Sequence, residues 1–158
     1  DEGFEILTLA QTGKSDPQPI VCIQAPGCDY WDDWSAFIVK QLLKRRLINE
    51  EDLSLFKIVN SAEAAVEEIS TFYRRYHSIR FVGKLMAMRL KSPISAEQLE
   101  QIQSRFGDLL SEGRFELRTA LEEELDEPTI ANLPRLVFSF NRRSAGRLRQ
   151  LIDYVNSL

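Results

Sequence analysis

The segment from residue 29 to residue 34 combines carboxylates with aromatic rings. Its members are three aspartates and three aromatic residues: Asp29, Asp32, Asp33, Tyr30, Trp31 and Trp34. They follow the apolar run IVCIQA, which predicts a buried strand, and ligands of open α/β sheets bind just beyond the carboxyl ends of such strands. Carboxylates there can bind a ribose and aromatic rings can stack on a base, so Asp29, Tyr30 and Trp31 are candidate substrate-binding residues. The sequence leaves a second explanation open, in which the loop caps a helix and Trp34 packs in the core.

Glu2 is a second candidate for chemistry, because it lies in the first turn of a predicted helix. Apolar residues recur at Phe4, Leu7 and Ala10, and Gly13 supplies a typical helix end. The helix dipole favours a carboxylate near the start of a helix, which would explain Glu2 without any catalytic role. The residue spacing alone therefore leaves two explanations open for Glu2: a charge that stabilises the start of the helix, or a functional carboxylate.

Other side chains that often do chemistry have no partners in the sequence. His77 is the only histidine and is not accompanied by a nucleophile or a metal ligand, so we assign it no chemistry. Cys22 and Cys28 have neither the spacing of a zinc site nor that of a CxxC motif, so both are expected to be reduced. We therefore expect no metal and no cofactor.

The composition is that of a globular protein with one ordinary domain or two small ones. The chain has 158 residues, of which 44% are hydrophobic and 28% are charged. No apolar run approaches the roughly 20 residues that cross a bilayer, so we expect no membrane partner. The net charge of −4 argues against a general affinity for nucleic acid, which depends on Lys and Arg. We expect a cytoplasmic protein without a nucleic-acid partner.

The first half of the chain alternates predicted helices and strands. Strands are expected at 20–25 and 54–59, as continuous apolar runs of the kind that parallel sheets bury. Helices are expected before the first strand, from Trp34, and directly after the second strand. The order α-β-α-β-α predicts an α/β domain with a mostly parallel sheet over 1–76, and two strands cannot make that sheet alone.

The second half has a different pattern, with strands that alternate apolar and polar residues. LMAMRL, GRFELRTAL and RLVFSF read as strands, and helices begin at Ser95 and Ser144. The order β-α-β-β-α predicts a small α+β domain of ferredoxin-like type over 84–158, after a junction at 77–83. Its expected core contains nine apolar residues: Met86, Met88, Leu99, Ile102, Phe106, Phe115, Phe138, Leu148 and Ile152. The acidic segment EEELDEPTIANLP is expected to be a surface loop.

Two arginines, Arg142 and Arg143, precede the last predicted helix. Together with the N-terminus of that helix they could bind an anion, because backbone N–H groups and the dipole favour negative charge there. Arginines are also ordinary on solvated helix faces, and that explanation stays open.

The segment DEGFEILTLAQTGKSDPQPIV resembles the stretch that follows the phosphate loop of the LOG family, the cytokinin riboside 5'-monophosphate phosphoribohydrolases formerly labelled lysine decarboxylases. Glu2 falls on the glutamate of the family pattern PGGxGTxxE, and Thr8, Gln11 and Gly13 fall on its T-x-x-Q-x-G helix ending. The likeness continues to the end of the chain, whose last part is similar to the extra domain of the larger bacterial members. The PGGxGT loop itself is not in the sequence.

The resemblance implies an enzyme that splits the N-glycosidic bond of a nucleoside monophosphate into a free base and ribose 5-phosphate. It makes Glu2 the catalytic carboxylate and 1–76 the C-terminal part of a Rossmann-like nucleotide-binding domain, whose upstream half would carry the phosphate loop. It further implies a chain that is inactive without that loop. If the upstream strands are absent, a sheet edge is expected to be exposed and to pair with another copy, so we expect a homo-oligomer. The alternative is a non-catalytic regulatory or oligomerising nucleotide-binding module.

Overall fold

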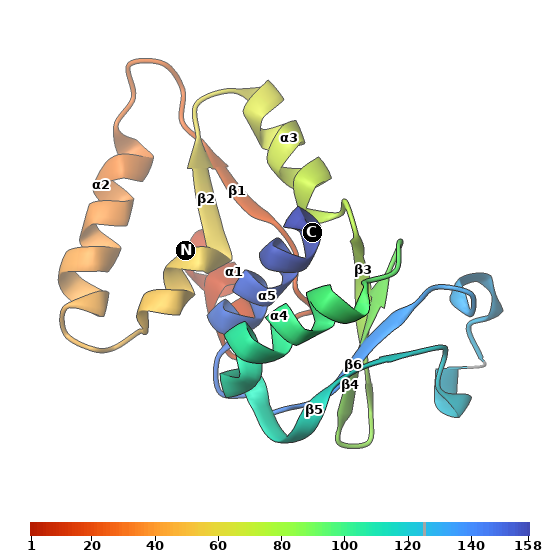
Figure 1. Cartoon of the computed structure of the whole chain (residues 1–158). Helices are drawn as coiled ribbons and strands as arrows, with labels where there is room; N and C mark the ends of the chain where they lie inside the picture. The colour runs from red at the N-terminus through yellow and green to blue at the C-terminus, as the bar shows by residue number, and fades with distance from the viewer. Residues whose placement is uncertain (125) are drawn as a thin grey trace. The chain divides into compact units, whose positions relative to one another are not determined.

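The computed structural model describes residues 1–124 and 126–158, and the chain forms two compact units (Figure 1). The first unit comprises Asp1–Phe72 and Ser144–Gln150, and the second comprises Tyr73–Arg143 and Leu151–Leu158. The first unit has a parallel pair of strands and the second has four antiparallel strands. The chain is therefore a mixed α/β protein, as the sequence predicts.

The first unit follows the predicted order α-β-α-β-α. Its elements are α1 (Glu2–Gln11), β1 (Ile20–Ile23), α2 (Tyr30–Phe37), a π-helical segment (Ile38–Leu43), a 3-10 helical segment (Glu50–Leu55), β2 (Phe56–Val59) and α3 (Ala62–Phe72). The two strands are parallel, with Ile20 opposite Phe56 and Ile23 opposite Val59. Both strands are shorter than predicted, and α2 begins at Tyr30, four residues before the predicted start at Trp34.

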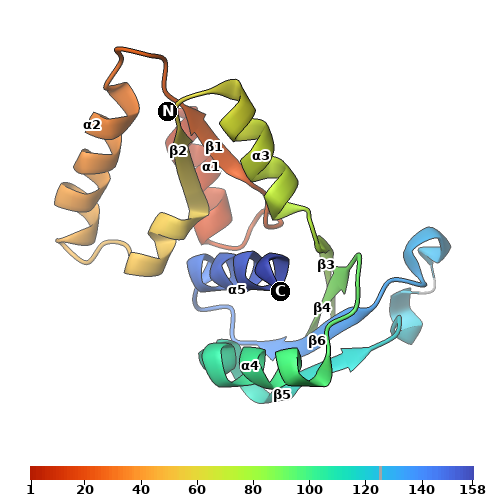
Figure 2. The same cartoon turned by 45° about the horizontal axis from the view of Figure 1, so that its top comes forward.

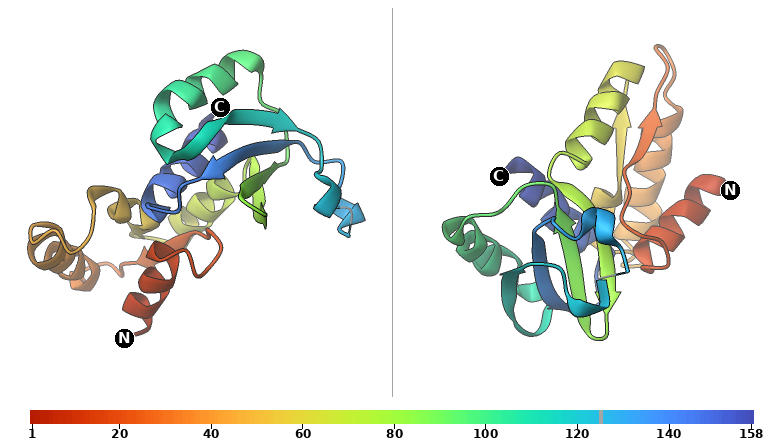
Figure 3. Two further views of the ribbon diagram at one scale, coloured as in Figure 1. Left: turned by 90° about the horizontal axis from the view of Figure 1, so that it is seen from below. Right: turned by 90° about the vertical axis from the view of Figure 1, so that its right-hand side faces the viewer.

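The helices of the first unit lie on both sides of its strands. Figure 3 shows α3 on one side of β1 and β2, and α1 and α2 on the other. A helix that precedes a strand in a parallel α/β unit runs back along the sheet, so its N-terminus points to the carboxyl ends of the strands. Figure 2 shows this arrangement for α1 and α2. The candidate residues at the starts of both helices therefore lie toward the same edge.

Large apolar side chains remain exposed on the first unit. They are Phe4, Ile6, Leu9, Ile23, Tyr30, Phe37, Leu47, Val66 and Ile69. Within residues 1–124 and 126–158, β1 and β2 pair only with each other, so each has one open edge. Open edges and exposed apolar surface favour association with further protein.

A glycine lets α5 (Ala145–Ser157) approach the 3-10 segment of the first unit very closely. A Cβ built on Gly146 would lie 2.2 Å from the carbonyl oxygen of Glu51 and 2.7 Å from the amide nitrogen of Asp52. Both contacts are with backbone atoms, which cannot move aside as a flexible side chain can. Next to this contact, Gln150 donates a hydrogen bond to Ser54 at 3.0 Å.

Gly146→Ala should therefore destabilise the first unit, by about 1 to 3 kcal/mol, the usual effect of overpacking. Alanine in an unconstrained helix interior would instead stabilise, by up to about 1 kcal/mol. Gly3 of α1 provides the matched control, because a Cβ there meets nothing within 4 Å. Urea unfolding followed by tryptophan fluorescence measures the effect, since Trp31 and Trp34 are the only tryptophans and both lie in this unit. Equal effects of Gly3→Ala and Gly146→Ala would contradict the close approach.

The second unit is an antiparallel sheet in the order β3-β4-β6-β5. Its elements are β3 (Tyr76–Val82), β4 (Leu85–Leu90), α4 (Ala96–Phe106), a short 3-10 turn (Gly107–Leu109), β5 (Leu110–Arg118), two 3-10 turns (Glu122–Glu124 and Pro128–Ile130), β6 (Arg135–Phe140) and the second half of α5. The order β-α-β-β-α from β4 onward is the predicted one. In addition, β3 occupies most of the segment that the sequence assigned to a junction at 77–83.

The core of the second unit is built from the predicted alternation. Met86, Met88 and Phe138 are almost fully buried, and the rings of Phe115 and Phe138 lie 4.7 Å apart. Of the nine predicted core residues, Leu99 is only half-buried, while Leu148 is buried in the first unit.

The predicted surface loop of the acidic segment is wrong for Glu124, whose side chain is fully buried. Glu124 accepts hydrogen bonds from Arg89 on β4 at 2.8 Å and from Arg135 on β6 at 3.3 Å. The neighbouring Glu127 binds Arg89 at 2.7 Å. The segment therefore packs on the sheet through ion pairs whose partners are distant in the sequence.

Candidate functional site

Glu2 is the first residue of α1, and its side chain is exposed. A hydrogen bond with its own backbone N–H lowers the pKa of the Glu2 carboxyl. Because the pKa is lowered, Glu2 is a carboxylate at neutral pH. It can act there as a charge stabiliser or as a base, but it has no proton to donate.

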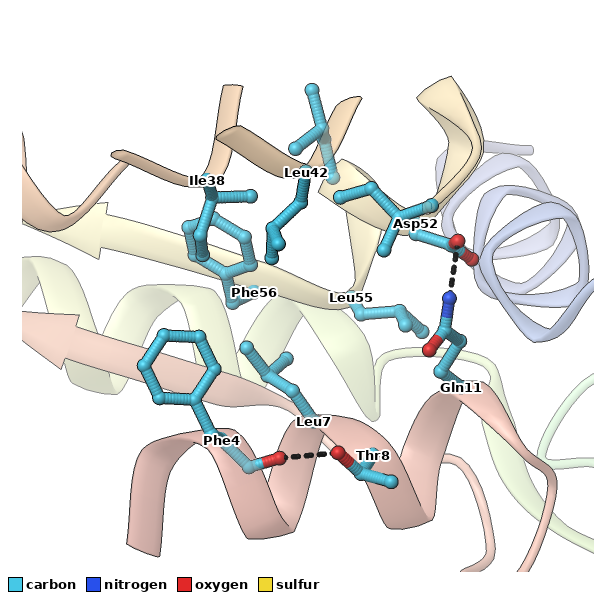
Figure 4. A pocket seen from close by; sticks show the side chains of 11 residues that line it. Phe4, Leu7, Thr8, Gln11, Ile38, Leu42, Asp52, Leu55 and Phe56 are labelled. Atoms are coloured by element: carbon cyan, nitrogen blue, oxygen red, sulfur yellow. Dashed lines mark hydrogen bonds between the residues drawn. The ribbon is translucent and has the colours of Figure 1, made fainter. Parts of the chain in front are cut away.

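The residues of the expected helix ending have structural roles. The Thr8 hydroxyl donates to the Phe4 carbonyl at 2.7 Å, and Gly13 has a φ of 66°, which ends the helix. Gln11 donates to the buried Asp52 carboxylate at 2.7 Å, which ties α1 to the 3-10 segment (Figure 4). The Asp52 carboxylate also accepts a hydrogen bond from the backbone N–H of Asn49 at 2.9 Å. These contacts fix the position of α1 and so the place of Glu2.

Figure 4 also shows the small apolar pocket between α1 and the segments that lead into β2. Its volume is about 90 Å³, and Phe4, Ile38 and Phe56 are among its lining residues. Binding sites for small molecules usually measure about 300 Å³ or more. This pocket is therefore a packing gap and does not hold a nucleotide.

Aromatic contacts join the N-terminal halves of α1 and α2. The centroid of the Trp34 ring lies 5.5 Å from that of Phe4, 5.4 Å from that of Trp31 and 5.1 Å from that of Phe56 on β2. Trp34 thus packs between the two helices and β2, but it is only half-buried and not part of the core. Tyr30 touches Trp31 at 5.0 Å and is itself 62% exposed. Since Phe4 is half a turn from Glu2, the predicted carboxylate and the predicted aromatic residues belong to adjoining helix ends.

Asp29 is the N-cap residue of α2, but its side chain makes no capping hydrogen bond. The capping role falls to Gln24, whose Oε1 accepts the amides of Trp31 at 2.9 Å and Asp32 at 3.2 Å. The Nε2 of Gln24 donates to Asp32 Oδ2 at 2.6 Å. The Asp29 carboxylate therefore makes no capping hydrogen bond, and it lies next in sequence to the exposed Tyr30.

Sequence reasoning named Asp32 but missed Gln24 and Asn60, which lie in the same hollow. These residues line an open hollow of about 380 Å³ at the carboxyl ends of β1 and β2. Gln24 and Asn60 each follow the last residue of a parallel strand. This position in the sequence could have identified Gln24 and Asn60 as candidates, because α/β sheets bind ligands at the carboxyl ends of their strands.

The remaining candidates form no reactive centre. His77 shares a hydrogen bond of 2.8 Å with Ser78, and burial, Lys91 and Arg89 lower the pKa of its imidazole. Cys22 is buried, Cys28 is exposed, and both are free thiols. In the part of the chain that the structure describes, no three metal-binding side chains come together. No helix in that part is long and apolar enough to span a membrane.

Comparison with known proteins finds a family that matches the first part of the chain. The family described as "Possible lysine decarboxylase" matches residues 1–69. No curated protein matches, and no solved structure matches. The match covers α1, both parallel strands and most of α3, which are the elements that position Glu2 and the Asp29–Trp31 segment. This match confirms the resemblance to the family over residues 1–69.

Proposed function

We propose that the chain is the C-terminal portion of a LOG-like phosphoribohydrolase, which hydrolyses the N-glycosidic bond of a nucleoside monophosphate. The observation that carries the proposal is the family match over residues 1–69, with Glu2 as the first residue of α1. Under this proposal the first unit completes a Rossmann-like domain, and the second unit, whose sheet begins with β3, is a domain of ferredoxin-like type.

The chemistry needs a carboxylate close to the sugar. As the bond between ribose and base breaks, positive charge develops on the ribose ring. An ionised Glu2 can stabilise that charge or activate the attacking water. A glycine-rich loop before α1 would place the phosphate at the helix N-terminus, where backbone N–H groups and the dipole bind anions. The sugar then lies beside the first turn of α1.

Asp29, Tyr30 and Trp31 bind the substrate in this proposal. The exposed Tyr30 ring offers a stacking surface for the base. The Asp29 carboxylate, which makes no capping hydrogen bond, can accept hydrogen bonds from hydroxyl groups. Their helix adjoins α1 through Trp34 and Phe4. The open strand edges and exposed apolar side chains support a homo-oligomer.

A hydrolysis assay tests the proposal. Purine and pyrimidine nucleoside 5'-monophosphates are incubated with the 158-residue chain and with a longer form in which a PGGxGT segment encoded by the same gene precedes Asp1. We expect release of ribose 5-phosphate and free base from at least one nucleotide by the longer form, and none by the 158-residue chain. Nucleotide binding by the longer form without any release would contradict the enzyme and support the non-catalytic module.

A further inference from the structure

A second hollow lies in the second unit, and none of its lining residues belongs to the proposed hydrolase site. It has a volume of about 400 Å³ and lies where the β3–β4 turn meets the start of β5 and the end of β6. In Figure 1 this turn is at the lower end of the sheet. We propose that this hollow binds a small metabolite through a phosphate or carboxylate group, with Arg142 and Lys84 as its cationic ligands.

Arg142 is prepared to bind an anion. Its guanidinium lies over the ring of Phe81, 4.4 Å from the centroid, and makes no hydrogen bond or ion pair with residues 1–124 or 126–158. Stacking holds the planar group in place while the N–H donors at its edge remain available for an oxyanion. In an arginine that forms an ion pair within the protein, those donors would already be hydrogen-bonded.

The backbone at Arg142 is in a conformation that non-glycine residues rarely adopt. Its φ is 57°, and the neighbouring Asn141 fixes the turn, because its side chain accepts the Arg143 amide at 2.9 Å and donates to the Asp108 carbonyl at 2.7 Å. Such strained residues cluster at binding sites. The turn therefore aims Arg142 at the hollow at some cost in stability.

Two further charges line the hollow without partners. Lys84, in the β3–β4 turn, and Glu112, at an irregularity of β5, form no ion pair within the described residues. Irregularities of this kind often redirect a side chain toward a site. With Arg142, the lining carries two positive charges and one negative charge. An anionic group suits the two cations, and a hydroxyl or amine on the same ligand suits Glu112.

The floor of the hollow is polar. Ser139 on β6 is only 6% exposed, and its hydroxyl lies 2.8 Å from that of Ser111. Ser111 is exposed, so the two hydroxyls give the hollow a polar lining that can hydrogen-bond a polar occupant. Together with its size, which is within the range of about 300 to 1,000 Å³ for small-molecule sites, this floor supports a compact polar metabolite.

NMR titration of the ¹⁵N-labelled 158-residue chain at constant ionic strength tests the proposal. Inorganic phosphate, pyrophosphate and citrate are the probes, so that the phosphate and carboxylate arms distinguish the two kinds of anion. We expect saturable shifts at residues 83–84, 111–112 and 139–142 for at least one probe. Shifts that do not saturate, or that spread over all basic residues, would overturn the site.

Charge-matched variants separate a site from general charge attraction. Arg142→Gln and Lys84→Gln should each weaken binding about tenfold, the usual effect of losing a hydrogen bond to a charged group. Arg143→Gln is the control, because this exposed neighbour does not line the hollow and loses the same charge. Equal weakening by all three variants would refute the site. The titration involves no hydrolysis, so its outcome is independent of the proposed function.

Discussion

Glu124→Gln should destabilise the second unit by about 3 to 5 kcal/mol, the effect of removing one partner from a buried ion pair. Glutamine has the same shape, so the packing stays and only the charge is lost. Arg89 and Arg135, which are 4% and 0% exposed, would then be buried without a counter-ion at Glu124. Arg89 retains Glu127, whereas Arg135 is left with backbone carbonyls such as that of Ile130 at 2.9 Å.

Urea unfolding followed by circular dichroism, together with hydrogen exchange of β4 and β6, measures this loss. The control is Glu123→Gln, which removes the same charge from the preceding, exposed residue of the same 3-10 turn. Surface substitutions of this kind usually change stability by less than about 0.5 kcal/mol. A Glu124→Gln protein as stable as the Glu123→Gln protein would show that the buried cluster contributes nothing to stability.

The same carboxylate makes stability depend on pH. Burial alone would raise the pKa of Glu124, but hydrogen bonds from the Leu121 amide, Arg89 and Arg135 outweigh it and lower the pKa. Glu127, bound by Arg89 and Arg80, also has a lowered pKa. A carboxyl group with a lowered pKa in the folded state stabilises above its unfolded pKa of about 4.3 and loses that contribution as the pH falls further. Glu124→Gln should therefore flatten the acid limb of the stability curve.

Local signals explain what the sequence predicted correctly. The capping box of α4 needs only Ser95 and Gln98, whose side chains each bind the other's backbone amide. The alternation in β4 and β6 likewise placed Met86 and Phe138 in the core. Such features depend on residues within a few positions of one another, so a single sequence contains them completely.

Partners distant in the sequence explain what was missed. Glu124 belongs to a run of acids that reads as solvated, and its burial depends on Arg89, 35 residues away. β3 is the exception, because it pairs with β4 across a two-residue turn at Gly83 and Lys84, a local hairpin signal that the sequence prediction did not use. At the candidate site, Gln24 caps α2 from the end of β1, a role for which Asp29 is the expected residue type.

Glu2→Gln is the most direct test of the catalytic carboxylate. In the longer form with a phosphate loop, we expect turnover to fall about a hundredfold or more, the typical effect of losing a catalytic acid or base. Nucleotide affinity should stay within several-fold, because the phosphate and the base are bound by other groups. The fold should also persist, since a charge at a helix N-terminus contributes only about 0.3 to 1 kcal/mol.

Glu5 supplies the matched control for that experiment. It is also in the first turn of α1 and exposed, so Glu5→Gln removes the same charge from the same helix. Steady-state kinetics of both variants, with affinity measured separately by calorimetry, distinguish chemistry from binding. If Glu2 acts on the ribose, only Glu2→Gln loses turnover, because Glu5 lies nearly a full turn further along the helix. Unimpaired turnover of Glu2→Gln, or equal losses in both variants, would return Glu2 to the role of a helix-end charge and remove it from the mechanism.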